Sequence, residues 1–161
     1  AETQVEALRR QIDDQMKKLE IGQTAYHREA SRLESLKNIT ERYDGYGSSI
    51  RRVMEQKDRR PGIHGVVADL IKTEKKYETA IETALGGSIQ NIVTDNEQTA
   101  KRLIEFLKKN RYGRATFLPL TNMRKSGFPN QDALREPGVI GVADTLVESG
   151  DQYRTLLSQL L

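Results

Sequence analysis

The chain has 161 residues, of which 36% are hydrophobic and 30% charged, and it contains no cysteine. A chain of this length holds one compact domain with an appendage, and without cysteine it has neither a disulfide framework nor a thiolate metal site. No apolar run approaches the roughly 18–20 residues that cross a membrane. The charged N-terminus also lacks the apolar core of a signal peptide. We therefore expect a protein without membrane contact.

Charge is distributed unevenly along the chain. Residues 1–44 carry 8 basic and 9 acidic side chains, and the remaining residues carry 18 basic and 14 acidic side chains. The net charge of +3 therefore combines −1 in the first segment with +4 in the second. A mild basic excess on the second segment is compatible with a nucleic-acid partner but does not by itself identify one.

Residues 1–44 are predicted to form a long helix of the coiled-coil type. The segment has no proline and a single glycine, and with Val5 at heptad position a, eight of the twelve a and d positions are apolar. Sustained a and d periodicity with charged flanks is typical of coiled coils. An ordinary amphipathic helix lying on the domain is the alternative, but about 44 residues would span some 66 Å at 1.5 Å per residue, which is too long for a domain of this size to cover. The residues predicted to pair in the coiled coil are Val5, Leu8, Ile12, Leu19, Tyr26, Leu33, Leu36 and Tyr43.

The segment 45–161 is predicted to be an α+β domain with a small mixed sheet. Its parts are a core over 45–120, a polar surface loop over 121–138 and a final part over 139–161. Gly45 and Gly47 end the arm, and Ser48 or Ser49 is expected to cap a short helix that buries Ile50, Val53 and Met54. Strands and helices then alternate, which favours mixed α and β structure. Strands are expected to start at residue 65 and to cover 89–93 and 114–118, with helices over 74–85, from Asn96 to 110 and after Asp151.

The sequence offers no legible catalytic site. His27 and His64 are its only histidines, and neither has a second ligand at a suitable spacing, so a metal site or a Ser-His-Asp arrangement is disfavoured. The glycines of Leu85-Gly86-Gly87-Ser88 end a helix and lack the lysine of a phosphate loop, so they are interpreted as a helix cap. We expect no catalytic residue, metal or cofactor in this chain.

Two basic clusters are the candidate DNA-binding residues. The first lies at the root of the arm, and the second lies at the end of the 96–110 helix. Cations at a helix C-terminus also complement the helix dipole without any ligand, so the second cluster has a purely structural alternative. Both clusters could bind phosphates. The candidates are Arg51, Arg52, Lys57, Arg59, Arg60, Lys108, Lys109 and Arg111.

Four ordered runs resemble the hinge of structural maintenance of chromosomes (SMC) proteins. They are GVVADLI at 65–71, KYETAIETALGG at 76–87, QNIV at 90–93 and GRATFLPL at 113–120. Each run is weak by itself, but the set is specific in its order and spacing and extends the resemblance over about residues 45–161. The coiled-coil arm that precedes the hinge in SMC proteins matches the first 44 residues.

The resemblance implies the first half of a bacterial SMC hinge with its inbound coil. Such hinges pair into dimers by joining sheets, and the expected dimer edge here is Arg114, Ala115, Thr116, Phe117 and Leu118. The implied partners are a second SMC protomer, DNA, a kleisin-type subunit at distant heads, and a second half of the hinge with the outbound coil. The heads would bind ATP and Mg²⁺. The implied role is loading onto DNA and the condensation and segregation of chromosomes, in the cytoplasm at the nucleoid.

Two other classes of protein compete with this interpretation. A small enzyme with a helical oligomerisation stalk would need a set of polar catalytic residues that the sequence does not show. A scaffold with a coiled-coil stalk at a membrane surface is disfavoured, because interfacial helices carry a Lys/Arg-rich polar face and the charges of the arm are balanced.

Overall fold

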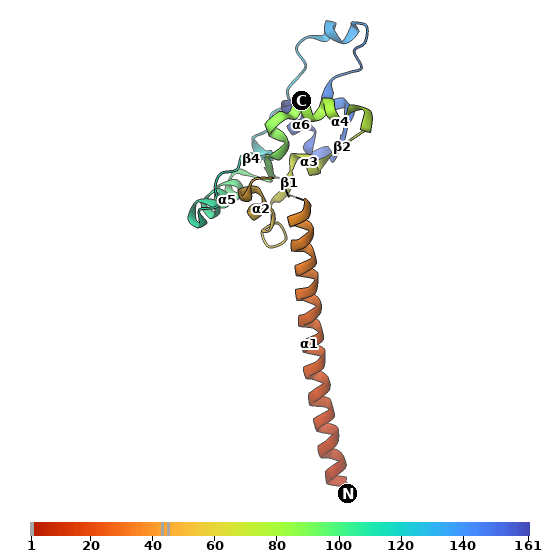
Figure 1. The fold of residues 1–161 in the computed structure, drawn as a ribbon, viewed down its shortest axis with the longest axis vertical. Helices are drawn as coiled ribbons and strands as arrows, with labels where there is room; N and C mark the ends of the chain where they lie inside the picture. The colour runs from red at the N-terminus through yellow and green to blue at the C-terminus, as the bar shows by residue number, and fades with distance from the viewer. Residues whose placement is uncertain (1, 43, 45) are drawn as a thin grey trace. The chain divides into compact units, whose positions relative to one another are not determined.

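The computed structural model describes residues 2–42, 44 and 46–161. The contacts divide the chain into two compact units, Ala1–Asp44 and Gly45–Leu161. The first unit is one helix, α1 (Glu2–Arg42), which Figure 1 draws in red and orange. The second unit mixes helices with two small sheets. The predicted α+β fold with a long N-terminal helix is confirmed.

The apolar stripe of α1 is exposed along most of its length. Six of the predicted coiled-coil residues, Val5, Leu8, Ile12, Leu19, Tyr26 and Leu33, are each 50–70% exposed. Leu36 is half-buried, and Tyr43 lies outside the described residues. Because a helix with so many exposed large apolar side chains gains little from burial within its own unit, its stripe is available to a partner.

A three-stranded sheet forms the centre of the second unit. Its order is β1 (Ile63–Val66), β3 (Ile92–Thr94) and β4 (Phe117–Pro119). β1 runs antiparallel to β3, and β3 runs parallel to β4. Parallel neighbours need a long crossover connection, which α5 (Glu97–Asn110) provides. The β-branched residues Ile92, Val93 and Thr94 are fully buried, as expected for a central strand.

Helices cover the central strand on both of its faces. Val93 packs with Ile81 and Leu85 of α4 (Glu78–Leu85) and with Leu156 and Leu157 of α6 (Arg154–Leu160). Side chains alternate along a strand, so Ile92 and Thr94 point to the opposite face, where α5 contacts β3 and α2 (Ser48–Met54) contacts α5. The buried residues of α5 are Thr99, Ala100, Leu103 and Leu107, at the helical spacing that the sequence indicates.

A second sheet, which the sequence did not reveal, has two antiparallel strands. β2 (Ile71–Thr73) pairs with β5 (Val147–Ser149), and the Thr73 hydroxyl donates to the Leu146 carbonyl at 2.9 Å. Short connecting helices fill the rest of the unit. They are α3 (Val67–Leu70), η1 (Lys75–Tyr77), η2 (Gly86–Gln90), η3 (Leu120–Asn122), η4 (Gln131–Arg135), η5 (Ala143–Leu146) and η6 (Asp151–Tyr153). The predicted surface loop over 121–138 is largely exposed and contains η4.

The predicted strand bounds need correction. The segment from residue 65 is the end of β1, and α3 begins at Val67. The strand expected over 89–93 starts only at Ile92, because η2 continues the chain after α4. The strand expected over 114–118 is β4, which starts at Phe117, so Arg114, Ala115 and Thr116 precede it. The Arg114 carbonyl instead accepts a 2.6 Å hydrogen bond from the Ser49 hydroxyl.

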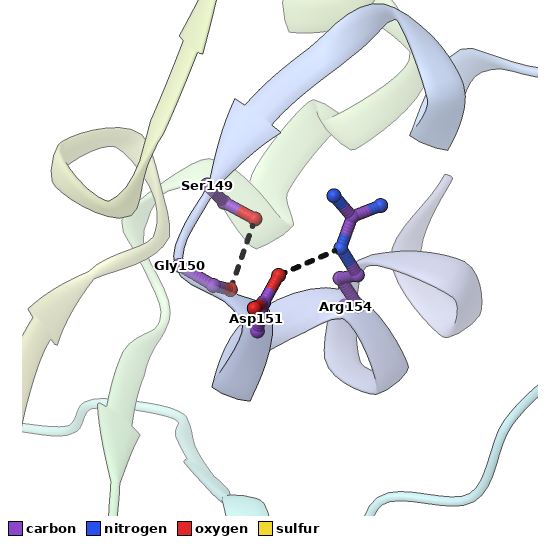
Figure 2. A network of polar contacts seen from close by, with 4 residues as sticks. All are labelled: Ser149, Gly150, Asp151 and Arg154. Carbon is purple, nitrogen blue, oxygen red and sulfur yellow. Dashed lines mark hydrogen bonds and ion pairs between the residues drawn. The ribbon is translucent and has the colours of Figure 1, made fainter.

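Two predicted helix caps are wrong, and one is confirmed. Gly47 occupies the cap position of α2, and Ser49 is turned away to Arg114. Asp151 is the first residue of η6, and Figure 2 shows its carboxylate paired with Arg154 Nε at 3.2 Å, not with a helix N–H group. Asn96 does cap α5, since its side chain accepts a 2.9 Å hydrogen bond from the Thr99 N–H.

Candidate nucleic-acid interface

Packing of α2 against α5 joins the two basic clusters through a pair of aromatic rings. The guanidinium of Arg52 lies 5.0 Å from the ring centre of Tyr112, and that of Arg60 lies 5.2 Å from the ring centre of Phe106. The two rings meet edge to face at 5.6 Å. Each arginine is therefore oriented by a cation–π contact, which itself uses none of the guanidinium's hydrogen-bond donors. We call Arg52, Arg60, Phe106 and Tyr112 the arginine–aromatic ladder.

The end of α5 explains how Tyr112 reaches the ladder. Arg111 adopts the left-handed conformation with φ 55° and ψ 38°, and the Tyr112 N–H then donates to the Leu107 carbonyl at 3.0 Å. A non-glycine residue in this conformation costs roughly 1–2 kcal/mol. The reversal folds Tyr112 back beside Phe106 and leaves the exposed side chains of Lys108, Lys109 and Arg111 at the same end of the helix.

The remaining candidates of the first cluster differ in their surroundings. Arg51 is half-buried, and its Nε atom is buried without a hydrogen-bond partner. Lys57 and Arg59 are exposed. Arg52 also contacts Glu55 at 3.3 Å, but both groups are partly exposed, and such pairs contribute roughly 0–1 kcal/mol. The ladder thus keeps most of its positive charge available.

Arg102 is a basic residue of this surface that the sequence analysis missed. It lies one turn into α5 and lines a pocket of about 300 Å³ together with Arg59, Arg60, Pro61, Thr99 and Leu103. Its neighbour in the sequence, Lys101, makes a second basic pair on the helix that ends with Lys108 and Lys109. The two basic pairs on one helix are the feature of the sequence that could have indicated Arg102. Only the packing of α2 against α5, however, brings Arg102 next to Arg59 and Arg60.

A network of polar contacts through Thr99 connects Arg102 of this pocket with Asp95. Thr99 is 3% exposed, and its hydroxyl accepts a 3.2 Å hydrogen bond from Arg102 Nη2. The hydrogen bond between the Thr99 side chain and the Asp95 carboxylate holds the pKa of Asp95 below its ordinary value, with smaller help from the Asn96 N–H and the charge of His64. Partial burial opposes this shift but does not cancel it.

His64 has a structural partner instead of a catalytic one. It lies at an irregularity in the pairing of β1 with β3, between the partners of Thr94 and Val93. Its Nδ1 shares a 2.7 Å hydrogen bond with the Tyr153 hydroxyl, and the two rings meet edge to face at 5.5 Å. This contact ties β1 to η6. Among the described residues, no group of three or more His, Cys, Asp or Glu side chains could hold a metal ion.

The predicted dimer edge lies at one end of the central sheet. β4 is the last strand in the order β1-β3-β4. Phe117 and Leu118 belong to β4 and are half-buried, whereas Arg114, Ala115 and Thr116 precede it in the chain.

In the part of the chain that the structure covers, no helix is long and apolar enough to span a membrane.

These features define a class of protein: a small α+β module that follows a long helix with an exposed apolar stripe and that carries a basic surface with aromatic residues. The family model described as the flexible hinge domain of SMC proteins matches residues 60–161. The chain therefore belongs to the SMC hinge family.

Relatives and solved structures agree with this assignment. The chromosome partition protein Smc of Lactiplantibacillus plantarum is 37% identical over 163 residues, which cover 99% of this chain and 14% of that protein. The corresponding protein of Bacillus subtilis is 42% identical over 134 residues, covering 81% of this chain and 11% of that protein. The chain thus spans only a small part of the length of these curated relatives.

Two solved hinge structures share the fold. An asymmetric dimer of the Geobacillus stearothermophilus SMC hinge domain is 38% identical with a TM-score of 0.71, and the match covers 84% of this chain and 59% of that chain. The Pyrococcus furiosus Smc hinge domain with an extended coiled coil is 26% identical with a TM-score of 0.60, covering 83% of this chain and 48% of that chain.

Proposed function

We propose that the chain is the arm and hinge portion of a chromosome partition protein, where it pairs with a second protomer and contacts DNA. Membership of the SMC hinge family and similarity to a hinge dimer support the pairing. The relatives named as chromosome partition proteins support a role at the chromosome, in the cytoplasm. By the same family relationship, ATP and Mg²⁺ would bind at heads elsewhere in the parent protein, with a kleisin-type subunit bridging them.

The arginine–aromatic ladder is the observation that carries the DNA contact. The ring of Tyr112 orients Arg52, which also pairs with Glu55, and the ring of Phe106 orients Arg60. Lys108, Lys109 and Arg111 extend the positive surface from the end of α5. Guanidinium and ammonium groups bind phosphates without reading the base sequence. We therefore propose weak binding that is independent of sequence and that releases counterions from about three phosphates.

Three charge-reversal variants of equal charge change test this proposal. We expect Arg52→Glu with Arg60→Glu to weaken binding more than Lys108→Glu with Lys109→Glu, since the ladder arginines are preoriented. Arg124→Glu with Lys125→Glu changes an exposed pair outside the ladder and should have the smallest effect. Fluorescence anisotropy with duplex and single-stranded DNA over a salt series should give a log–log slope of about −2 to −3 for the unmodified chain.

Two results would contradict the DNA contact. One is equal affinity of all three variants at low salt, since the effect must depend on where the charge lies. The other is preference for one base sequence, because phosphate contacts carry no base information.

A further inference from the structure

The pocket beside the ladder contains three arginines and no acidic side chain. It lies where the turn after α2 meets the first turns of α5, and Arg59, Arg60, Pro61, Thr99, Arg102 and Leu103 line about 300 Å³. This volume is at the lower end of the range for sites that hold small ligands. Buried Leu103 supplies an apolar wall, so the pocket offers both cationic and apolar contacts.

Within the described part of the chain, the charges of these arginines are not neutralised by ion pairs. None of the ion pairs between residues that the structure describes includes Arg59, Arg60 or Arg102. Arg60 is oriented by the ring of Phe106, and Arg102 by the hydroxyl of Thr99. Two of the three guanidinium groups are thus held by neutral partners, which preserves their full charge for a ligand.

The number of arginines in the pocket indicates which of two kinds of phosphate group it suits better. A phosphodiester inside a nucleic-acid strand carries one negative charge, whereas a terminal phosphate carries about −1.5 to −2 at neutral pH and has one more free oxygen. Three guanidinium groups around one small pocket match the group with more charge and more acceptors. We propose that this pocket binds a terminal phosphate or diphosphate, at the 5′ end of a nucleic-acid strand or on a free nucleotide.

Thr99 acts in this site as a positioning residue. Its hydroxyl accepts from Arg102 and bonds to the Asp95 carboxylate, so one buried oxygen connects the pocket to the polar network beneath. Removing the hydroxyl should release Arg102 and also remove the main cause of the lowered pKa of Asp95. A serine at this position keeps both contacts.

The test compares phosphorylated and unphosphorylated ends on the full chain. A short single strand labelled at its 3′ end is titrated with either a 5′-phosphate or a 5′-hydroxyl, and ADP and pyrophosphate are titrated separately by calorimetry. We expect the 5′-phosphate to bind about tenfold more tightly, the order expected of additional charge-assisted contacts. The advantage should increase from about pH 5 to pH 7, because the second ionisation of a phosphate monoester lies near pH 6.

Variants separate the pocket from the ladder. Arg102→Gln should abolish the 5′-phosphate advantage, so that the two strand ends bind with equal affinity. Thr99→Val should reduce the advantage and raise the pKa of Asp95 toward its ordinary value in a carboxyl NMR titration, whereas Thr99→Ser should restore both. If the ladder does not contact DNA but the pocket does bind phosphate, ADP and pyrophosphate should still bind to the chain.

Each outcome bears on the proposal directly. Binding of ADP that competes with the 5′-phosphate strand supports the pocket and identifies free nucleotides as a source. A 5′-phosphate advantage without measurable ADP binding supports it with strand ends as the source. Equal affinity for both strand ends together with no binding of ADP or pyrophosphate overturns it, as does an Arg102→Gln variant that binds phosphorylated ligands like the unmodified chain.

Discussion

Asp95 occupies the point where β3 ends and α5 begins, and it connects several surrounding elements. Its N–H donates to the Gly62 carbonyl at 2.9 Å, and its Oδ1 accepts from the Asn96 N–H at 2.7 Å. Gly62 has φ 97°, and a Cβ atom built there would lie 2.6 Å from Asp95 Oδ1. Glycine is needed at position 62 both for its backbone conformation and for the carboxylate beside it.

Replacement of Asp95 by asparagine should change the acid dependence of stability. The folded-state pKa of Asp95 lies below its ordinary value of 3.8, so the charged carboxylate stabilises the fold above that pH. This contribution is lost as the pH falls through the ordinary value toward the folded-state pKa. Asp95→Asn should therefore lower the free energy of unfolding at about pH 7, and the difference should shrink toward about pH 3.

Urea unfolding followed by circular dichroism at several pH values measures this effect. Asp151→Asn is the matched control, since that carboxylate is exposed and its ion pair is with exposed Arg154. A constant difference between the Asp95 variant and the unmodified chain from about pH 7 to pH 3 would show that the charge of Asp95 does not stabilise the fold.

Some residue roles could be predicted from the sequence because they depend on near neighbours. Asn96 caps α5 through Thr99, three residues later. The roles of Ser49 and Arg102 depend on distant segments instead. Ser49 bonds to Arg114, and Arg102 lines a basic pocket together with Arg59 and Arg60. Asp151 has an arginine three residues later that competes for its carboxylate. Ile104 follows buried Leu103 but is 50% exposed, because α5 buries a narrow stripe.

At the scale of elements, α5 determines where the candidate sites lie. Its first turns hold Thr99 and Arg102, its last turn holds Lys108 and Lys109, and Phe106 lies just before that last turn. Its amphipathic pattern, its cap and its bounds could be predicted because all are local. The two-stranded sheet could not, because β2 and β5 have three residues each and lie far apart in the sequence. Strands this short carry almost no periodic signal.

The N-cap of α5 gives a prediction for this element. Asn96→Ala should lower the free energy of unfolding by about 1 kcal/mol, since it removes the acceptor for an N–H group in the first turn. The matched variant is Asn130→Ala, whose side chain accepts from the Ala133 N–H at 3.4 Å in an exposed segment. It should cost much less. Urea unfolding of both variants measures the difference, and equal losses would show that the cap of α5 contributes nothing particular.

At the scale of the whole molecule, two surfaces are of the kind that pairs with another chain. The stripe of α1 is exposed, and β4 ends the central sheet. The hinge of Geobacillus stearothermophilus is longer than the region matched, which covers 59% of that chain. Exposed strand edges and apolar stripes promote association unless they are covered.

We expect this chain either to associate with itself or to require the rest of the hinge for a stable assembly. Light scattering of the chain alone, and after mixing with a peptide that spans the second hinge half and the outbound coil, distinguishes these states. A defined complex with two copies of each piece is the expected result. A stable, monodisperse monomer that does not bind the added peptide would contradict the proposed pairing.

The pairing of β2 with β5 also has a consequence for the order of folding. All of α4, β3, α5 and β4 lie between these two strands in the sequence, whereas the unit of β3, α5 and β4 is continuous. Closing a longer loop costs more entropy, so the continuous unit can form early and the β2–β5 ribbon only late. During synthesis the ribbon must wait until residues near 149 have left the ribosome. Until then, β2 has no partner strand.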